Sequence, residues 1–225
     1  MSCSSNETHQ TDHAAHDGAH GDHHQHGHHG PGKHGNPEDL EAYINKMIDP
    51  ERDAWQKPQA VLDALNIGAG QAVCDIGVGP GYWAFPIAKR VGDTGQVWAV
   101  DVEATMLADL QQRIAEASTT NIIPVLAQPA DPLLPLASCD VILVVNTYHH
   151  FPDGPTYLKR LAQSLKPGGR IVNIDFHKRE MPVGPPVDHK IAHEDFIADV
   201  DKAGLKVAAD HDLLEHQYFV EITAP

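Results

Sequence analysis

Residues 73–82 of the 225-residue chain, Val-Cys-Asp-Ile-Gly-Val-Gly-Pro-Gly-Tyr, place three alternate glycines directly after an apolar run. The apolar run predicts a buried strand, and the glycines predict a tight turn. From Tyr82 to Val91, apolar residues recur at the spacing of one helical face, which predicts a helix. A strand, a glycine turn and a helix start form a nucleotide-binding βα unit, in which the backbone approaches a ligand closely and offers it N–H groups.

The spacing of the glycines distinguishes two kinds of nucleotide site. A dinucleotide fingerprint has the pattern Gly-x-Gly-x-x-Gly, but its last position is Tyr82 here and the third glycine comes one residue early, at Gly81. Asp75 lies two residues before the first glycine, Gly77. The resulting Asp-x-Gly-x-Gly-x-Gly pattern resembles motif I of the class I S-adenosylmethionine-dependent methyltransferases.

The resemblance extends over roughly residues 50–225 and has direct implications for fold and activity. It implies an α/β fold: a Rossmann-like, doubly wound sheet of seven strands, six parallel and the last antiparallel, with helices on both faces. It also implies S-adenosyl-L-methionine as cofactor, with the glycine loop around the amino-acid part of that molecule. The expected activity is methyl transfer to a small-molecule acceptor.

Two later strands carry further matches to the family. The predicted strand 96–100 ends at Asp101, which matches the acid that binds the ribose hydroxyls in the family. A cap for the helix that starts near Ala104 is a second use, compatible with the first. The strand 122–126 is followed by residues 128–131, where the family contacts adenine. The resemblance therefore implies a cofactor set of Asp75, Gly77, Gly79, Gly81, Tyr82, Asp101, Val102, Ala130, Asp131 and Asn146.

The apolar run 140–146 predicts a central parallel strand, and polar residues follow it directly. Ligands of open α/β sheets bind at the carboxyl ends of the strands, so residues 146–150 are expected at the acceptor site. An imidazole is a suitable base for a hydroxyl, carboxyl or amine acceptor. We expect His150 or His149 in this role, oriented by Asp175 or Tyr148. The alternative is that one histidine only caps the loop.

Charge and cysteine content narrow the class of protein. The net charge of −15 with neutral histidines disfavours a nucleic-acid partner, and no apolar run approaches the ~20 residues of a transmembrane helix. Three cysteines do not make a disulfide framework. Cys74 and Cys139 are expected as small, unpaired core residues.

The N-terminal part of the chain has a different composition. Residues 1–35 contain ten histidines and almost no apolar residue, which predicts a disordered tail able to bind a divalent metal. Residues 36–225 are expected to form the methyltransferase domain, with 36–70 as a helical lid. In this lid, helices are expected to start after Asn36 and at Asp49, with a break at Lys57-Pro58, and the candidate lid residues are Arg52, Trp55 and Gln56. Cys3 and the polar residues after it resemble the start of a mature bacterial lipoprotein. A cytoplasmic location is slightly favoured, because the methyl donor is made there, and export with anchoring through Cys3 is the alternative.

Other functions remain open from the sequence. A metal-handling protein could combine the tail with a folded set drawn from His149, His150, His177 and His189. A scaffold that binds the methyl donor without turnover would share the same loop. A dinucleotide-dependent oxidoreductase is disfavoured, because Tyr82 occupies the last glycine position of the dinucleotide fingerprint. The sequence gives no information on the acceptor, the oligomeric state or the need for a metal.

Overall fold

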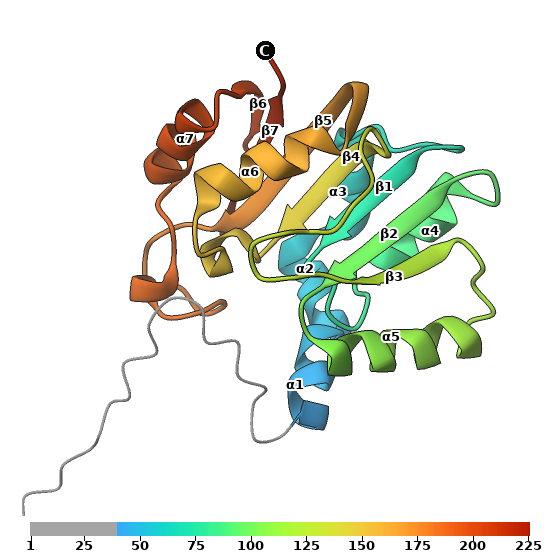
Figure 1. Ribbon diagram of the computed structural model, residues 1–225. Helices are drawn as coiled ribbons and strands as arrows, with labels where there is room; N and C mark the ends of the chain where they lie inside the picture. The colour runs from blue at the N-terminus through green and yellow to red at the C-terminus, as the bar shows by residue number, and fades with distance from the viewer. Residues whose placement is uncertain (1–39) are drawn as a thin grey trace, which may run out of the picture.

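A computed structural model describes residues 40–225, which form a seven-stranded sheet between two layers of helices (Figure 1). The strands are β1 (Ala72–Ile76), β2 (Gln96–Asp101), β3 (Ile122–Leu126), β4 (Cys139–Val145), β5 (Leu165–Phe176), β6 (Lys206–His211) and β7 (Gln217–Thr223). Their order is β3-β2-β1-β4-β5-β7-β6. β7 runs antiparallel between β5 and β6, and the other six strands are parallel to one another. The predicted fold class is therefore confirmed.

The helices fall on the two faces of the sheet. They are α1 (Leu40–Met47), α2 (Asp53–Gln56), α3 (Pro58–Ala64), α4 (Ala84–Val91), α5 (Ala104–Glu116), α6 (Gly154–Gln163) and α7 (His193–Lys202), with 3₁₀ turns η1 (Pro50–Arg52), η2 (Tyr148–His150) and η3 (Val187–His189). α3 and α4 cover one face, and α6 and α7 cover the other (Figure 1). None of the helices within 40–225 has the length and apolar character needed to cross a bilayer.

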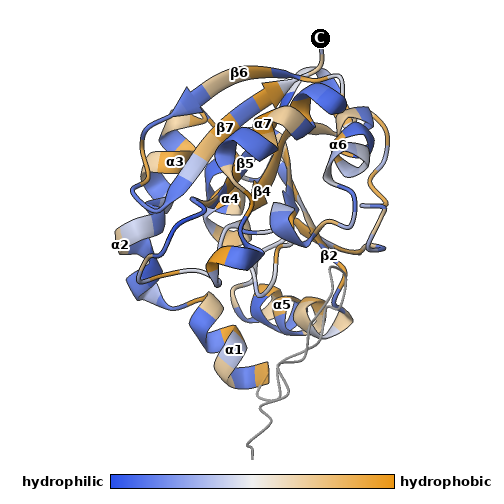
Figure 2. Cartoon of the chain, turned by 90° about the vertical axis from the view of Figure 1, so that its left-hand side faces the viewer, coloured by the Kyte–Doolittle hydropathy of each residue, from blue (hydrophilic) through white to orange (hydrophobic). Residues whose placement is uncertain are grey.

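Alternate residues of the central strands pack into the two layers. In β4, Val141 and Leu143 join the core with α3 and α4, whereas Ile142 and Val144 join the core with α6 and α7. All four side chains are fully buried. Figure 2 shows the apolar residues concentrated in the central strands β4 and β5. A parallel strand covered on both faces needs such a continuous apolar run, as the sequence indicated.

Local signals before β1 act as expected. The Asp49 side chain accepts a hydrogen bond from the Glu51 N–H and caps η1. Lys57 adopts a φ of 45° between α2 and α3, and Pro58 begins α3, so the predicted break at this pair is confirmed. The helix start expected near Asn36, like the tail 1–35 and Cys3, lies outside the described residues.

Residues 166–169, whose Lys-Pro-Gly-Gly sequence is typical of a turn, lie within β5. This strand begins at Leu165, which pairs with Cys139, and the register shifts before Val141 pairs with Arg170. Gly168, with a φ of 80°, accommodates the irregularity. Leu165 and Arg170 pair with β4 on either side of residues 166–169, for which the β4–β5 register gives no partners, so these turn-forming residues make an irregularity inside the strand.

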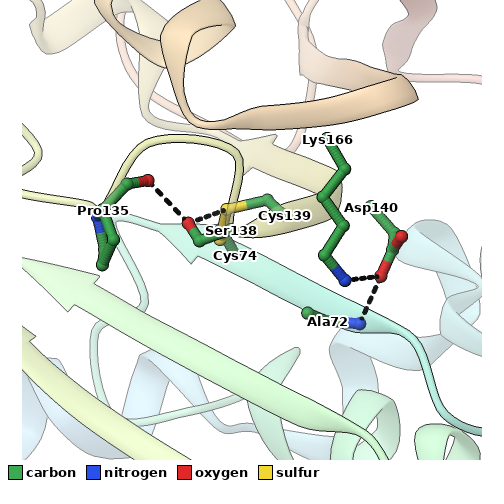
Figure 3. The surroundings of a disulfide bond; sticks show 7 residues. All are labelled: Ala72, Cys74, Pro135, Ser138, Cys139, Asp140 and Lys166. Carbon is green, nitrogen blue, oxygen red and sulfur yellow. Dashed lines mark hydrogen bonds and ion pairs between the residues drawn. A yellow bond between two sulfur atoms is a disulfide. The ribbon is translucent and has the colours of Figure 1, made fainter.

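The expectation of unpaired cysteines is wrong. Cys74 and Cys139 are fully buried and joined by a disulfide, with their Cα atoms 6.0 Å apart (Figure 3). The pair links β1 to β4 on the side of the sheet that faces α6 and α7. Beside it, the Asp140 carboxylate accepts hydrogen bonds from the Ala72 N–H and the Lys166 ammonium, each at 2.7 Å. Burial of both cysteines was expected, but they are 65 positions apart in the sequence, and local pattern does not show that their strands are neighbours.

Candidate functional site

A cavity lies at the carboxyl ends of β1, β2 and β4, on the edge where an open α/β sheet binds its ligands. Residues from the segment before β1, from the glycine loop and from the loops after β2, β3 and β4 line it. They are Tyr43, Met47, Arg52, Ile76, Gly77, Val78, Gly79, Pro80, Tyr82, Trp83, Val100, Asp101, Val102, Glu103, Met106, Ala127, Pro129, Val145, Asn146, Thr147, His150, Phe151 and Tyr157.

The glycine loop requires its glycines for space and for backbone conformation. Gly77 and Gly79 have φ values of 72° and 52°. A Cβ atom at Gly77 would overlap the side chain of Thr147, and one at Gly79 would lie 2.5 Å from Cε of Met47. Gly81, with a φ of 98°, does not line the cavity, and a Cβ there would meet Leu110 and Phe85. Gly81 therefore allows the loop to pack on the core.

The loop amides are largely used within the protein. The N–H groups of Gly77 and Val78 both donate to the Val100 carbonyl, at 2.8 and 3.0 Å. The Gly79 N–H donates to Oδ2 of Asp101 at 2.8 Å. The sequence suggested that this backbone offers its donors to a ligand, but these three donors hold the loop against β2. Here the loop contributes a close-fitting shape.

Asp101 lies at the end of β2 and connects the loop to α5. Oδ2 accepts from Gly79, and Oδ1 accepts from the Glu103 N–H at 2.9 Å, at the start of α5. The side chain lines the cavity. The two uses expected from the sequence are thus compatible, because a carboxylate can accept several hydrogen bonds.

Asp75 lies behind the loop and outside the set that lines the cavity. The residue is 2% exposed, and its Oδ2 has no hydrogen-bond partner among residues 40–225. Burial, assisted by the nearby Asp101 charge, raises the pKa of Asp75 to about 7. The Asp75 carboxyl group therefore holds its proton to a much higher pH than an exposed aspartate does.

The loop after β4 provides the side of the cavity where the acceptor was expected. Asn146, with a φ of 54°, and His150 both line the cavity, and Oδ1 of Asn146 accepts from Nε2 of Gln217 at 2.7 Å. His149 does not line it, and its Nδ1 lies 3.0 and 2.9 Å from the two carboxylate oxygens of Asp175. The two imidazole centroids are 4.2 Å apart. The structure brings the histidines together but gives them different surroundings.

Tyr148 serves the packing of α7. Its hydroxyl donates to Oδ2 of Asp199 at 2.9 Å, and its ring meets Phe196 edge to face at 4.8 Å. Burial and the Asp199 carboxylate raise the pKa of Tyr148 above its ordinary value. Of the two residues expected to orient a histidine, Asp175 contacts His149, whereas the hydroxyl of Tyr148 is bonded to another element.

The adenine contacts expected after β3 lie at neighbouring positions. Ala130 and Asp131 are not among the residues that line the cavity, whereas Ala127 and Pro129 are. The Asp131 carboxylate pairs with Arg160 of α6 at 2.6 Å. Val102, just after Asp101, lines the cavity as the resemblance implied.

The segment before β1 forms one wall of the cavity. Of the expected lid residues, Arg52 lines the cavity and Gln56 is fully buried. The ring centroid of Trp55 lies 5.7 Å from that of Phe176. Several lining residues were not predicted from the sequence, and these include Tyr43, Met47, Phe151 and Tyr157. They come from separate helices and turns, so no single motif identifies them.

The histidines considered as metal ligands are not gathered into a ligand set. Within residues 40–225, no group of three or more His, Cys, Asp or Glu side chains is arranged to hold a metal ion. His177 lines a different cleft, with His193 and His211, and His189 lies in η3. Metal binding by the tail stays a prediction, because its ten histidines precede the described residues.

The fold and the cavity define a Rossmann-like α/β protein with a nucleotide site at the switch point of its sheet. Residues 73–169 match a family model described as a methyltransferase domain. A SAM dependent methyltransferase from Aquifex aeolicus has a similar structure, with a TM-score of 0.77 at 25% identity, over 80% of this chain and 96% of that one. Residues 73–169 thus belong to a methyltransferase domain family, and the fold is that of the S-adenosylmethionine-dependent methyltransferases.

Two curated relatives show how much of the chain is shared with known methyltransferases. A nocamycin O-methyltransferase from Saccharothrix syringae is 34% identical over 111 residues, covering 49% of this chain and 40% of that protein. A ubiquinone/menaquinone biosynthesis C-methyltransferase UbiE from Laribacter hongkongensis is 31% identical over 128 residues, covering 56% and 52%. The chain thus spans about half the length of the curated relatives it matches.

Proposed function

We propose that this protein is an S-adenosyl-L-methionine-dependent methyltransferase that acts on a small-molecule acceptor. The observation that carries the proposal is one cavity lined by Gly77 and Gly79 of the glycine loop, by Asp101 and by His150. Relatives named as C- and O-methyltransferases of quinone and nocamycin biosynthesis support a small organic acceptor.

The lining residues suit the parts of the cofactor. The Asp101 carboxylate would accept hydrogen bonds from the ribose hydroxyls, and the apolar side chains of Val102, Met106 and Ala127 would receive the adenine. The tight loop at Gly77 and Gly79 leaves no room for larger residues. When bound, the cofactor supplies an activated methyl group, and the work left to the protein is alignment of the acceptor and exclusion of water.

His150 is the group proposed to take a proton from the acceptor. It lines the cavity, whereas the His149 side chain is 5% exposed and is held by Asp175. A base must come within hydrogen-bond reach of the proton it removes, which favours His150. The adjacent His149 is proposed as a positioning residue that fixes the turn η2.

Calorimetry with S-adenosylhomocysteine and with NAD tests the cofactor, and release of S-adenosylhomocysteine over a panel of quinones, phenols, carboxylic acids and amines tests the reaction. We expect S-adenosylhomocysteine to bind and NAD not to bind. Binding of NAD alone would contradict the proposal in favour of an oxidoreductase. Cofactor binding without turnover of any acceptor would instead support the scaffold alternative.

The disulfide favours export over the cytoplasmic location. Buried structural disulfides form in oxidising compartments and are rare in the cytoplasm, and the Cys74–Cys139 pair is fully buried. Alkylation of intact cells with N-ethylmaleimide, followed by mass analysis without reductant, tests this. In an exported protein, both cysteines should remain bonded to each other and unalkylated. If both cysteines are alkylated after denaturation, the disulfide is absent in the cell, and a cytoplasmic location is favoured instead.

A further inference from the structure

Among the residues of 40–225 that line the cavity, Arg52 is the only lysine or arginine. Its guanidinium carbon lies 4.3 Å from the centroid of the Tyr82 ring. Tyr82 is the residue immediately after the last glycine of the loop. The acidic Asp101 contacts the same loop at Gly79 instead. The Arg52 guanidinium therefore lies beside Tyr82, whereas the Asp101 carboxylate, the proposed ribose ligand, lies beside Gly79.

The guanidinium is held in place by neutral partners. Nη1 donates to the Met47 carbonyl, and Nη2 donates to Oε1 of Gln56 at 3.3 Å. The neighbouring Asp53 carboxylate accepts from the Tyr82 hydroxyl at 2.5 Å. Burial lowers the pKa of Arg52 from its ordinary value, since its charge is partly removed from water. A guanidinium has five N–H donors, and these two bonds use two of them.

The contacts with Met47 and Tyr82 fix the position of the Arg52 guanidinium. Met47, whose carbonyl receives Nη1, has its Cε 2.5 Å from where a Cβ of Gly79 would lie, so α1 is packed directly on the loop. The guanidinium lies over the face of the Tyr82 ring, which attracts it because the face of an aromatic ring attracts a cation. Arg52 is thus a preorganised, partly desolvated cation at the cavity wall, which is the form in which arginine binds carboxylates well.

We infer that Arg52 binds a ligand carboxylate, and that this is the carboxylate of the amino-acid part of S-adenosylmethionine and S-adenosylhomocysteine. The inference rests on the proposed function. With the ribose at Asp101 and adenine at Val102 and Met106, the amino-acid part extends to the remaining wall of the cavity, where Arg52 supplies its one full positive charge. Arg52 then also ties the segment before β1 to the bound cofactor.

Calorimetry with two ligands tests this inference. They are S-adenosylhomocysteine and 5′-S-(3-aminopropyl)-5′-thioadenosine, which differ only in the carboxylate. For Arg52→Gln we expect a ten- to hundredfold loss of S-adenosylhomocysteine affinity, as for a buried charge-assisted hydrogen bond. The affinity for the analogue should change less than about threefold. Arg52→Lys, which keeps the charge but not the fork, should give an intermediate loss.

The control variant is Arg113→Gln, which removes an arginine paired with Asp109 on α5. It should leave both affinities unchanged, and thermal unfolding should verify that each variant is folded. An equal loss for both ligands in Arg52→Gln would overturn the inference, because Arg52 would then only support the wall. Unchanged S-adenosylhomocysteine binding would also overturn it, and would leave a carboxylate of the acceptor as the remaining partner. Failure of the wild-type protein to bind S-adenosylhomocysteine would instead refute the proposed function.

Discussion

Nδ1 of His149 lies 2.9 Å from Oδ2 of Asp175, and the two side chains are 5% and 1% exposed. The Asp175 carboxylate also accepts from the His149 N–H at 3.4 Å. This pair joins the turn η2 to the end of β5, and so fixes the backbone that carries His150 into the cavity. The two adjacent histidines thus have different surroundings, since His149 is held by Asp175 and His150 lines the cavity.

Replacing His150 should affect turnover more than cofactor binding. His150→Ala is expected to lower kcat by about 10²- to 10⁴-fold, the usual contribution of a general base, with S-adenosylhomocysteine affinity within about threefold of wild type. His149→Ala should lower both kcat and the melting temperature, because it leaves Asp175 buried without its partner. The exposed His189→Ala is the control. Full turnover in His150→Ala would exclude the proposed base.

Asp101 should contribute strongly to cofactor affinity through its carboxylate. Asp101→Asn replaces a charged acceptor by a neutral one beside the ribose hydroxyls, and a hydrogen bond to a charged group contributes about 1.5–3 kcal/mol. We expect a ten- to hundredfold loss of S-adenosylhomocysteine affinity by calorimetry. Glu103→Gln, which changes the neighbouring lining acid, should lose less than about threefold. Similar losses in both variants would mean that the overall negative charge matters, and not the position of Asp101.

Asp75 should make stability depend on pH. Its pKa of about 7 in the fold exceeds the ordinary 3.8, so the fold disfavours the ionised form. The free energy of unfolding therefore loses a contribution as pH rises from about 4 through 7. Relative to wild type, Asp75→Asn should become progressively more stable over this range, by up to about 4 kcal/mol at pH 8. Urea unfolding at pH 4, 6 and 8 measures it, and a pH-independent difference would contradict the assignment.

The disulfide should contribute to stability by restricting the unfolded chain. It closes a loop with a sequence separation of 65, for which the chain-entropy relation gives about 4 kcal/mol. Dithiothreitol should lower the free energy of unfolding of wild type by about this amount, once denaturation exposes the buried bond. The double variant Cys74→Ala/Cys139→Ala should not respond to the reductant. Equal responses of the two proteins would show that the reductant acts elsewhere.

The sequence alone determined the parts of this protein that depend on local pattern. The spacing Gly77, Gly79 and Gly81, the apolar run 140–146 and the break at Lys57 specify a strand or turn within a few residues, and the structure has each of them. The seven-stranded sheet with its antiparallel last strand was expected from the family resemblance at these positions, whereas the order of the strands comes from the structure. Strand pairing then extended β5 back to Leu165 against the local turn signal.

Only the tertiary structure decided the contacts between distant segments. The Cys74–Cys139 bond depends on β1 and β4 being neighbours, and Arg52 reaches the cavity because α1 and η1 fold over the glycine loop. The same holds for Asp175, which approaches His149 and not His150. Local patterns record the preferences of nearby residues, whereas these contacts depend on how the strands and helices pack, which no short stretch of the chain encodes.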